Sequence, residues 1–236
     1  FGVDAVRYYL LSEMPHANDG SISYETIIER FNSDLANTLG NLVNRTVAMT
    51  NKYFGGSVKK VEPMDDIDRD LIKCAGETVE KYYTLMDAYR NADAVDLVMN
   101  FAKRCNKYID ETTPWLLAKD EAKADRLSTV LYNLVESLVV GASLLQPFMP
   151  ETAEKIVKQL NTSLREFDEL DKFGLYENGA KVVEQPEILF ARLDVNEVLE
   201  KVAEKKAAEE AANGNETAGN DGNVYDADYK VEDDNK

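Results

Sequence analysis

The chain has 236 residues, of which 44% are hydrophobic, and a formal net charge of −17. This hydrophobic content is typical of a globular protein and excludes a chain that is disordered throughout. The charge argues against nucleic-acid binding through a broad basic surface, because such surfaces carry excess Lys and Arg. No apolar run reaches the roughly 20 residues of a membrane span, so we expect a soluble protein in the cytoplasm that binds no membrane.

The chain opens with a short predicted helix, Asp4–Glu13, that ends before Pro15. The following loop holds the only histidine, His16, which has no carboxylate or nucleophile nearby in sequence. A plain loop residue is therefore favoured over a catalytic one. Ser23 then caps a second predicted helix.

The second helix leads, with a bend expected near Asn32 and Ser33, into a long predicted helix that spans Asn32–Phe54 and ends at Gly55-Gly56. At 100° per residue, one side of this long helix is mostly apolar. It consists of Leu35, Leu39, Leu42, Val43, Thr46, Val47, Met49, Thr50 and Tyr53. The opposite side is formed by Asn37, Asn41, Arg45, Ala48 and Lys52.

The outward row of this helix has an unusual composition. Solvated helix faces are usually built from Glu and Lys, whereas asparagine is a poor helix former. Residues 21–60 also hold five basic and three acidic side chains, in contrast to the acidic chain as a whole. The pattern favours hydrogen-bond recognition of a ligand, and an ordinary solvated face remains the alternative.

The middle of the chain predicts a series of core helices. Helical periodicity covers residues 65–90, 91–113, 121–146 and 151–160, and the third of these is the most apolar, which predicts a central helix. Pro114 suits the first turn of a short helix over Pro114–Lys119 that carries the only tryptophan, Trp115. From the pattern alone, core packing is favoured for this tryptophan over ligand binding.

The C-terminal third loses the helical period. Loops or a small hairpin are expected over residues 161–193, and a charged helix over 194–212. Residues 213–236 have almost no apolar side chains, so a disordered acidic linker is expected there. The predicted fold is all-α. Residues 1–20 precede a helical bundle over residues 21–193, and the charged helix and the acidic tail follow the bundle in the chain.

The sequence has no recognisable catalytic or metal-binding motif. Gly-rich phosphate loops, clusters of metal ligands and Ser/His/Asp or Cys/His arrangements are absent from it. The two cysteines, Cys74 and Cys105, are far apart without a Cys-x-x-Cys spacing, which disfavours a disulfide framework and a thiolate metal site. We therefore assign no catalytic residue and no metal ligand.

Three stretches resemble the C-terminal part of bacterial-type methionyl-tRNA synthetases: Asp4–Leu11, Asn32–Arg45 and Thr113-Pro114-Trp115. The resemblance implies a helical bundle of the class I aminoacyl-tRNA synthetase anticodon-binding type. It also implies binding of the CAU anticodon of methionine tRNA by Asn41, Arg45 and Trp115. Asn37, one turn earlier, is assigned the same role on a weaker match to the family. No DNA partner is implied.

The same resemblance places this chain within a longer enzyme. Residues 1–20 are similar to the end of the linker from the catalytic domain, and the acidic tail is similar to a tether that leads, in some members, to a C-terminal oligonucleotide-binding domain. The family's His-Ile-Gly-His and Lys-Met-Ser-Lys-Ser signatures and its cysteine-rich zinc knuckle are absent. We expect an anticodon-binding fragment without cofactors, whose parent ligase holds ATP, and in some members zinc, in its catalytic domain.

Two other interpretations stay open. The bundle could belong to a related synthetase, such as those for leucine, isoleucine, valine or cysteine, although Asn41, Arg45 and the Pro114-Trp115 step favour methionine. The chain could also be an acidic helical adaptor that binds proteins and no RNA. Comparing its binding to methionine tRNA and to a tRNA with another anticodon would distinguish these interpretations.

Overall fold

The computed structural model describes residues 1–13, 22–61 and 64–213. The predicted loop around His16 and the predicted disordered tail over 214–236 lie outside the described residues. The chain divides into two compact units, Phe1–Leu193 and Asp194–Lys236. Each unit is considered by itself.

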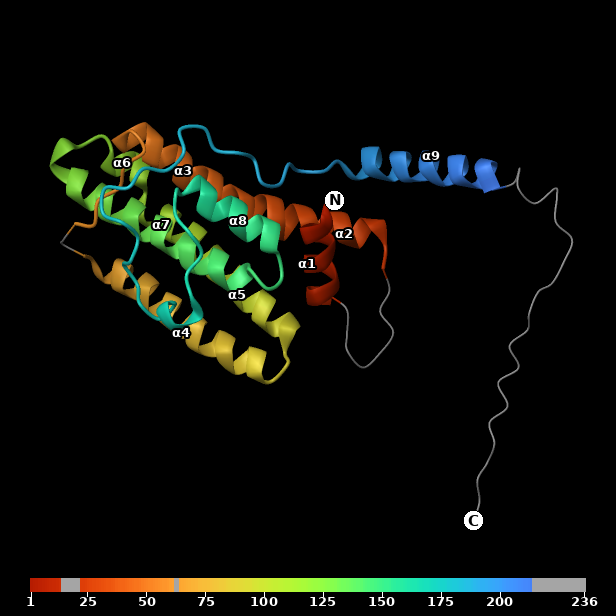
Figure 1. The fold of residues 1–236 in the computed structure, drawn as a ribbon. Helices are drawn as coiled ribbons and strands as arrows, with labels where there is room; N and C mark the ends of the chain where they lie inside the picture. The colour runs from red at the N-terminus through yellow and green to blue at the C-terminus, as the bar shows by residue number, and fades with distance from the viewer. Residues whose placement is uncertain (14–21, 62–63, 214–236) are drawn as a thin grey trace, which may run out of the picture. The chain divides into compact units, whose positions relative to one another are not determined.

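The first unit is built from helices (Figure 1). No strand is formed among the described residues, so the predicted all-α bundle is confirmed. Its elements in chain order are α1 (Val3–Glu13), α2 (Tyr24–Arg30), the π-helix η1 (Phe31–Gly40), α3 (Asn41–Phe54), α4 (Asp66–Asp87), α5 (Asn91–Thr112), α6 (Pro114–Leu117), the 3-10 turn η2 (Glu121–Lys123), α7 (Ala124–Leu145), α8 (Pro150–Gln159) and the 3-10 turn η3 (Phe167–Glu169).

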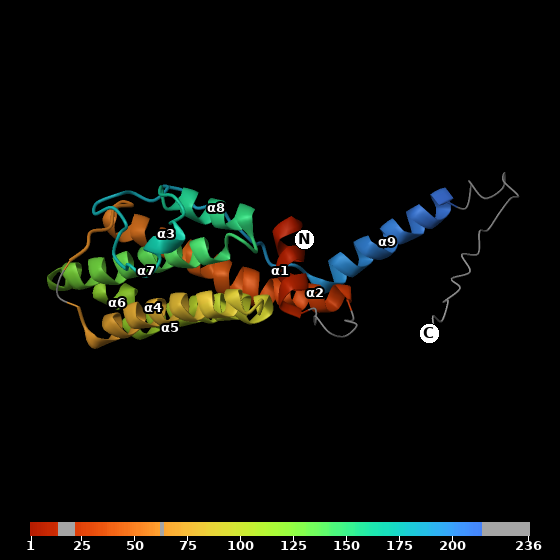
Figure 2. The ribbon, with the colours of Figure 1, turned by 60° about the horizontal axis from the view of Figure 1, so that its bottom comes forward.

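Helix α7 is the central helix, as its apolar sequence predicts. It packs against α3, α4, α5, α6 and α8 (Figure 2). Nearly all of its side chains from Leu127 to Leu145 are buried. Among the described residues, only the stretch Glu121–Leu145 is long and apolar enough to span a membrane, and its most apolar window is 94% buried inside the bundle. Its apolar length is therefore accounted for by the protein core.

The segment 161–193 is irregular, as predicted, and forms loops without a hairpin. Its only regular pairing among the described residues is an isolated bridge between Lys181 and Ser57. Glu136 of α7 is fully buried and holds the segment by accepting from the backbone N–H groups of Gly174, Leu175 and Tyr176 at 2.5, 3.0 and 2.9 Å. Arg165 Nη2 lies 2.6 Å from the same carboxylate, so one buried charge pair fastens the segment to the bundle.

The second unit contains α9 (Val195–Asn213), where a charged helix is expected from the sequence. Asp194 Oδ1 accepts from the backbone N–H groups of Asn196 and Glu197 at 2.9 and 3.1 Å. This is the usual N-terminal capping of a helix by an aspartate.

Candidate nucleic-acid interface

The helix expected to carry the site is continuous from α2 through η1 to α3, but it is not a uniform α-helix. The ten residues of η1 are π-helical, and the Asn41 N–H accordingly bonds to the Ala36 carbonyl five residues earlier. Thr38 Oγ1 bonds to the Ser33 carbonyl at 2.9 Å, also five residues back. A constant 100° per residue is therefore wrong over η1, and the bend expected near Asn32 is replaced by this wider helical stretch.

Buried polar contacts fix η1. The carboxylate of Asp34 is buried, and its Oδ2 accepts from the Tyr8 hydroxyl at 2.9 Å and from Arg30 Nη1 at 3.1 Å. Burial, together with the adjacent Asp34, raises the pKa of Tyr8, so its hydroxyl remains a donor at neutral pH. Asn32 exchanges two hydrogen bonds with the backbone of Leu193, at 2.9 and 2.8 Å. π-Helical stretches are rare and often occur at functional sites.

The two faces of the long helix are nevertheless as predicted. Most of the inward residues are buried, namely Leu35, Leu39, Leu42, Val43, Thr46, Val47 and Thr50. On the outward face Asn37, Asn41, Ala48 and Lys52 are exposed, and Arg45 is half-buried. The polar row therefore faces solvent, and its side chains are available to a ligand.

Arg45 is held in place from the neighbouring helix α5. Its Nη2 lies 3.1 Å from Asp110 Oδ1, and the Asp110 side chain is 65% exposed. A guanidinium has five N–H donors, so this ion pair orients Arg45 and leaves it able to donate to a ligand. Further along the interface Asn106 Nδ2 donates to the Thr38 carbonyl at 3.0 Å, which fixes α5 against η1. Asp110 could not be selected from sequence patterns, because only the fold brings it to Arg45.

Trp115 lies at the start of the short helix α6, after the left-handed residue Thr113 and the first-turn proline Pro114. It is 41% exposed, so the core packing favoured by the sequence pattern alone is wrong. Figures 1 and 2 place α6 at the end of the bundle where α3 ends. Asp110 precedes Trp115 by five residues, so the contact between Asp110 and Arg45 links the α3 face to the segment that carries the tryptophan.

Asn37 and Asn41 line a surface hollow of about 380 Å³. Its other lining residues are Ala36, Gly40, Asn44, Ile188 and Phe190, and Trp115 is not among them. Asn37 and Asn41 thus line one hollow, whereas the side chain of Arg45 is held against α5 by its ion pair with Asp110. Sequence analysis missed Asn44, which projects from the same helix, and Ile188, which arrives from the irregular segment.

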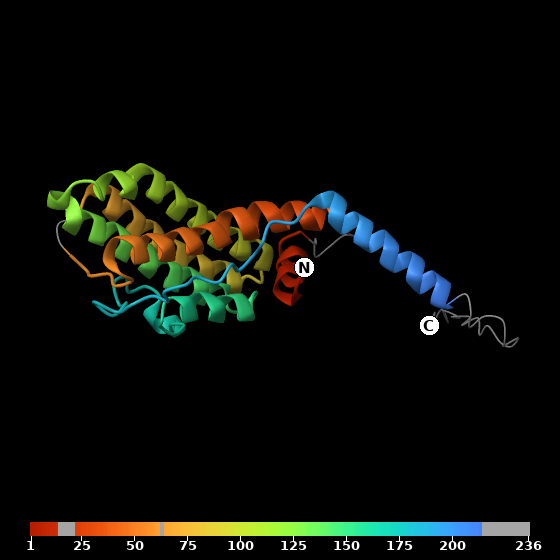
Figure 3. The same cartoon turned by 90° about the horizontal axis from the view of Figure 1, so that it is seen from above.

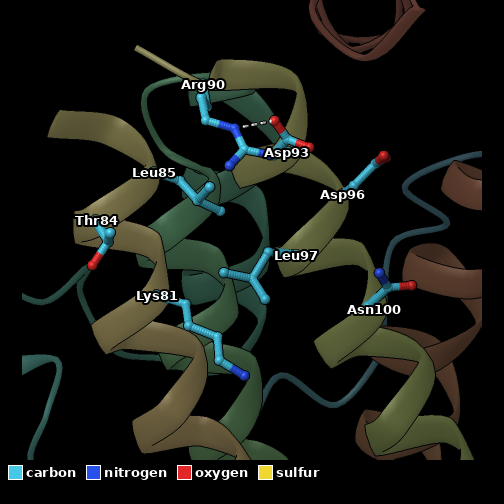
Figure 4. A pocket seen from close by; sticks show the side chains of 8 residues that line it. All are labelled: Lys81, Thr84, Leu85, Arg90, Asp93, Asp96, Leu97 and Asn100. Atoms are coloured by element: carbon cyan, nitrogen blue, oxygen red, sulfur yellow. Dashed lines mark hydrogen bonds and ion pairs between the residues drawn. The ribbon is translucent and has the colours of Figure 1, made fainter. Parts of the chain in front are cut away.

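A second hollow, of about 490 Å³, lies between α4 and α5 (Figure 4). Leu85 and Leu97 point toward each other between the helices, and Arg90 Nε is paired with Asp93 Oδ2 at 2.8 Å. Asp96 also lines this hollow, and burial raises the pKa of its carboxyl group. Lys81 and Arg90 line this hollow together with Asp93 and Asp96, so its charges balance and it has no excess positive charge to attract RNA.

The cysteines are free thiols in the bundle. Cys105 is buried, and burial raises the pKa of its thiol to about 12, which keeps it protonated and unreactive at neutral pH. Among residues 1–13, 22–61 and 64–213, no group of three or more His, Cys, Asp or Glu side chains is arranged to hold a metal ion.

Comparison with known proteins identifies the kind of bundle. Residues 68–217 match the family model "Anticodon-binding domain of tRNA ligase", and residues 1–47 match "tRNA synthetases class I (M)". Asn37, Asn41 and Arg45 lie in the second of these matches and Trp115 lies in the first. The chain belongs to the family of anticodon-binding domains of tRNA ligases.

Within this family its relatives are methionine–tRNA ligases. The chain is 48% identical over 206 residues to the enzyme of Clostridium acetobutylicum, and 44% identical over 201 residues to that of Bacillus subtilis. These matches cover 87% and 84% of the chain, and 32% and 30% of the two enzymes. The chain therefore spans about a third of the length of these relatives.

Solved structures agree with this assignment. The apo form of Mycobacterium tuberculosis methionyl-tRNA synthetase superposes with a TM-score of 0.76 at 36% sequence identity, and the match covers 82% of this chain and 39% of that one. The same enzyme in complex with methionyl-adenylate also gives 0.76 and 36%, covering 81% and 38%. The resemblance to methionyl-tRNA synthetases is confirmed, and so is the helical architecture.

Proposed function

We propose that this chain binds the CAU anticodon of methionine tRNA within a cytoplasmic methionine–tRNA ligase. Attachment of methionine, with ATP, takes place in a catalytic region outside these residues. The observation that carries the proposal is the row of exposed Asn37 and Asn41 and half-buried Arg45 on the outward face of a helix whose opposite face is buried. The similarity to methionine–tRNA ligases supports the same assignment.

The chemistry of this row suits a cytosine. The Watson–Crick edge of cytosine presents one amino donor and two acceptors. An arginine can donate to the acceptors, while the carbonyl of an asparagine side chain accepts from the amino group. Uracil presents a different order of donors and acceptors, so Asn41 and Arg45 together would prefer cytosine at the first anticodon position.

Trp115 supplies the aromatic surface that an unstacked base needs. Proteins that read single-stranded RNA loops splay the bases out and stack them on aromatic side chains. Trp115, at the start of α6, is 41% exposed, and the proline before it restricts the local backbone. We therefore assign Trp115 to stacking and the face of α3 to hydrogen-bond recognition.

Trp115→Ala should weaken binding of a CAU anticodon stem-loop by about 1–3 kcal/mol, because one stacking contact is lost. The measurement is a titration of the 236-residue chain with a fluorescent stem-loop. Leu116→Ala is the matched control, since Leu116 is the next residue and is 51% exposed. Equal affinities for the wild type and Trp115→Ala, with unchanged helicity, would remove Trp115 from the site.

The acidic character of the chain bears on how it binds RNA. Because the net charge is −17, affinity should come from a few short-range contacts instead of a broad positive field, and its dependence on salt should be shallow. A protein-binding adaptor would show no preference among stem-loops. The bundle of another class I synthetase would prefer a different anticodon.

A further inference from the structure

Helix α4 and the irregular segment form the walls of a third hollow, of about 640 Å³. It is lined mainly by Gly76, Glu80 and Tyr83 of α4 and by Phe167, Asp168 and Asp171 in and after η3. No residue of the long helix, of α5 or of α6 lines it. Seen from above, α5 and the irregular segment flank the long helix on opposite sides (Figure 3). A ligand in this hollow would therefore leave Arg45 and Trp115 open to RNA.

The walls of the hollow are held in place by contacts within the chain. The Tyr83 hydroxyl donates to the Phe167 carbonyl, and the two rings meet edge-to-face with their centroids 6.4 Å apart. Leu170, directly after η3, is buried and anchors the turn in the core. The hollow thus exists before a ligand arrives, so that binding requires little ordering of the protein.

Every charged side chain that lines the hollow is acidic. Glu80, Asp168 and Asp171 are exposed, and none of them forms an ion pair with any described residue. Their charges extend to the wall, because burial, together with Asp171 and Asp168, raises the pKa of Tyr83. Three unpaired carboxylates around one hollow repel one another, and a cation among them would relieve this repulsion.

The apolar part of the hollow is also left open by the fold. Phe167 is 48% exposed, although its ring touches that of Tyr83. Gly76 lies in the middle of α4, where glycine is a poor helix former. A Cβ at this position would meet no atom from another part of the chain within 4 Å. Packing within the chain does not require this glycine, and its bare backbone leaves a recess for a side chain of a partner.

An arginine side chain matches both parts of the hollow. A guanidinium stacks on aromatic rings and presents a fork of donors to carboxylates. We propose that the hollow is a docking site for a basic segment of another protein, in which an arginine stacks on Phe167 and pairs with Asp168 and Asp171. RNA does not fit, because its phosphates carry the same sign of charge as the rim. A second copy of this chain is disfavoured for the same reason, since each copy carries −17.

The test is a titration of the 236-residue chain with a fluorescent peptide of alternating arginine and leucine, at about 0.15 M salt. Phe167→Ser should weaken binding roughly fivefold to tenfold, because the stacking surface is lost. Asp168→Asn combined with Asp171→Asn should weaken it at least about tenfold and reduce its dependence on salt. The same peptide with glutamine in place of arginine should bind at least about tenfold more weakly.

Matched controls separate this site from general attraction to an acidic chain. Leu175→Ser changes a side chain of the same segment that is 48% exposed and lies outside the hollow. Glu177→Gln combined with Glu184→Gln removes two exposed carboxylates of that segment. Both controls should keep the affinity for the arginine peptide within about twofold of wild type, because distant exposed charges are screened at this salt concentration.

Gly76→Leu tests the hollow without disturbing the fold. The new side chain would fill the recess and should weaken peptide binding at least about tenfold. Leucine is a better helix former than glycine, so the melting temperature should not fall. The docking site would be overturned by a wild-type chain without saturable peptide binding, by equal losses in the site and control variants, or by wild-type affinity of folded Gly76→Leu. None of these measurements involves RNA, so the proposed function is tested separately.

Discussion

Arg45→Ala should remove the preference of the chain for cytosine over uracil at the first anticodon position. The expected loss is about 1–3 kcal/mol in binding the CAU stem-loop, as for other arginines that contact base edges. Arg45 is placed for this role by its ion pair with Asp110 and by its position on the exposed face of α3. The measurement is the ratio of dissociation constants for CAU and UAU stem-loops.

Two further variants separate recognition from charge and from folding. Arg45→Lys keeps the positive charge but loses the planar fork of donors, so it should also lose the preference for cytosine. Arg69→Ala removes an arginine that is likewise paired with an exposed carboxylate, Asp66 at 2.8 Å, on α4, and it should leave the ratio unchanged. A folded Arg45→Ala chain that retains the wild-type ratio would exclude Arg45 from base recognition.

Glu136→Ala should have the largest effect on stability. Its carboxylate is fully buried and binds Arg165, whose side chain is only 7% exposed, so the change leaves a buried charge without its partner. Breaking such a pair costs about 3–5 kcal/mol. Three backbone N–H groups, those of Gly174, Leu175 and Tyr176, lose their acceptor as well. For a unit of this size the melting temperature should fall by roughly 6–20 °C.

The matched control is Glu154→Ala, which removes an exposed glutamate on the surface of α8 and should change the free energy of unfolding by less than about 0.5 kcal/mol. Glu136→Gln keeps an acceptor for the backbone N–H groups but loses the charge, so its melting temperature should lie between those of Glu136→Ala and the wild type. A Glu136→Ala chain whose melting temperature lies within about 2 °C of the wild-type value would contradict the anchoring role of this carboxylate.

Helix positions and buried faces were predictable because they follow from local sequence. The period of apolar residues predicts α4, α5 and α7, and Ser23, whose side chain accepts from the Thr26 N–H at 3.2 Å, caps α2 as expected. Pro114 predicts the start of α6 for the same local reason. The outward positions of Asn37 in η1 and of Asn41 and Arg45 in α3 were predictable because the apolar side of this continuous helix is buried and fixes the opposite side.

The remaining features depend on contacts between distant parts of the chain. The π-helical register of η1 is held by Tyr8 and by Leu193, which lie 26 and 161 residues from their partners. Asp110 reaches Arg45 across 65 residues, and the backbone beside Ile188 is held by two hydrogen bonds between Gln159 and Glu187. Residues 161–193 carry no periodic pattern, so the sequence alone could not place Ile188 beside α3.

The most direct test of the proposed function is the affinity of the 236-residue chain for anticodon stem-loops at one fixed salt concentration. The comparison includes the CAU stem-loop of methionine tRNA, a UAU variant and a stem-loop with an unrelated anticodon. We expect the CAU stem-loop to bind tightest, and each wrong base read by the site to cost about 1–3 kcal/mol. Equal affinities for all three stem-loops would contradict anticodon recognition by this chain.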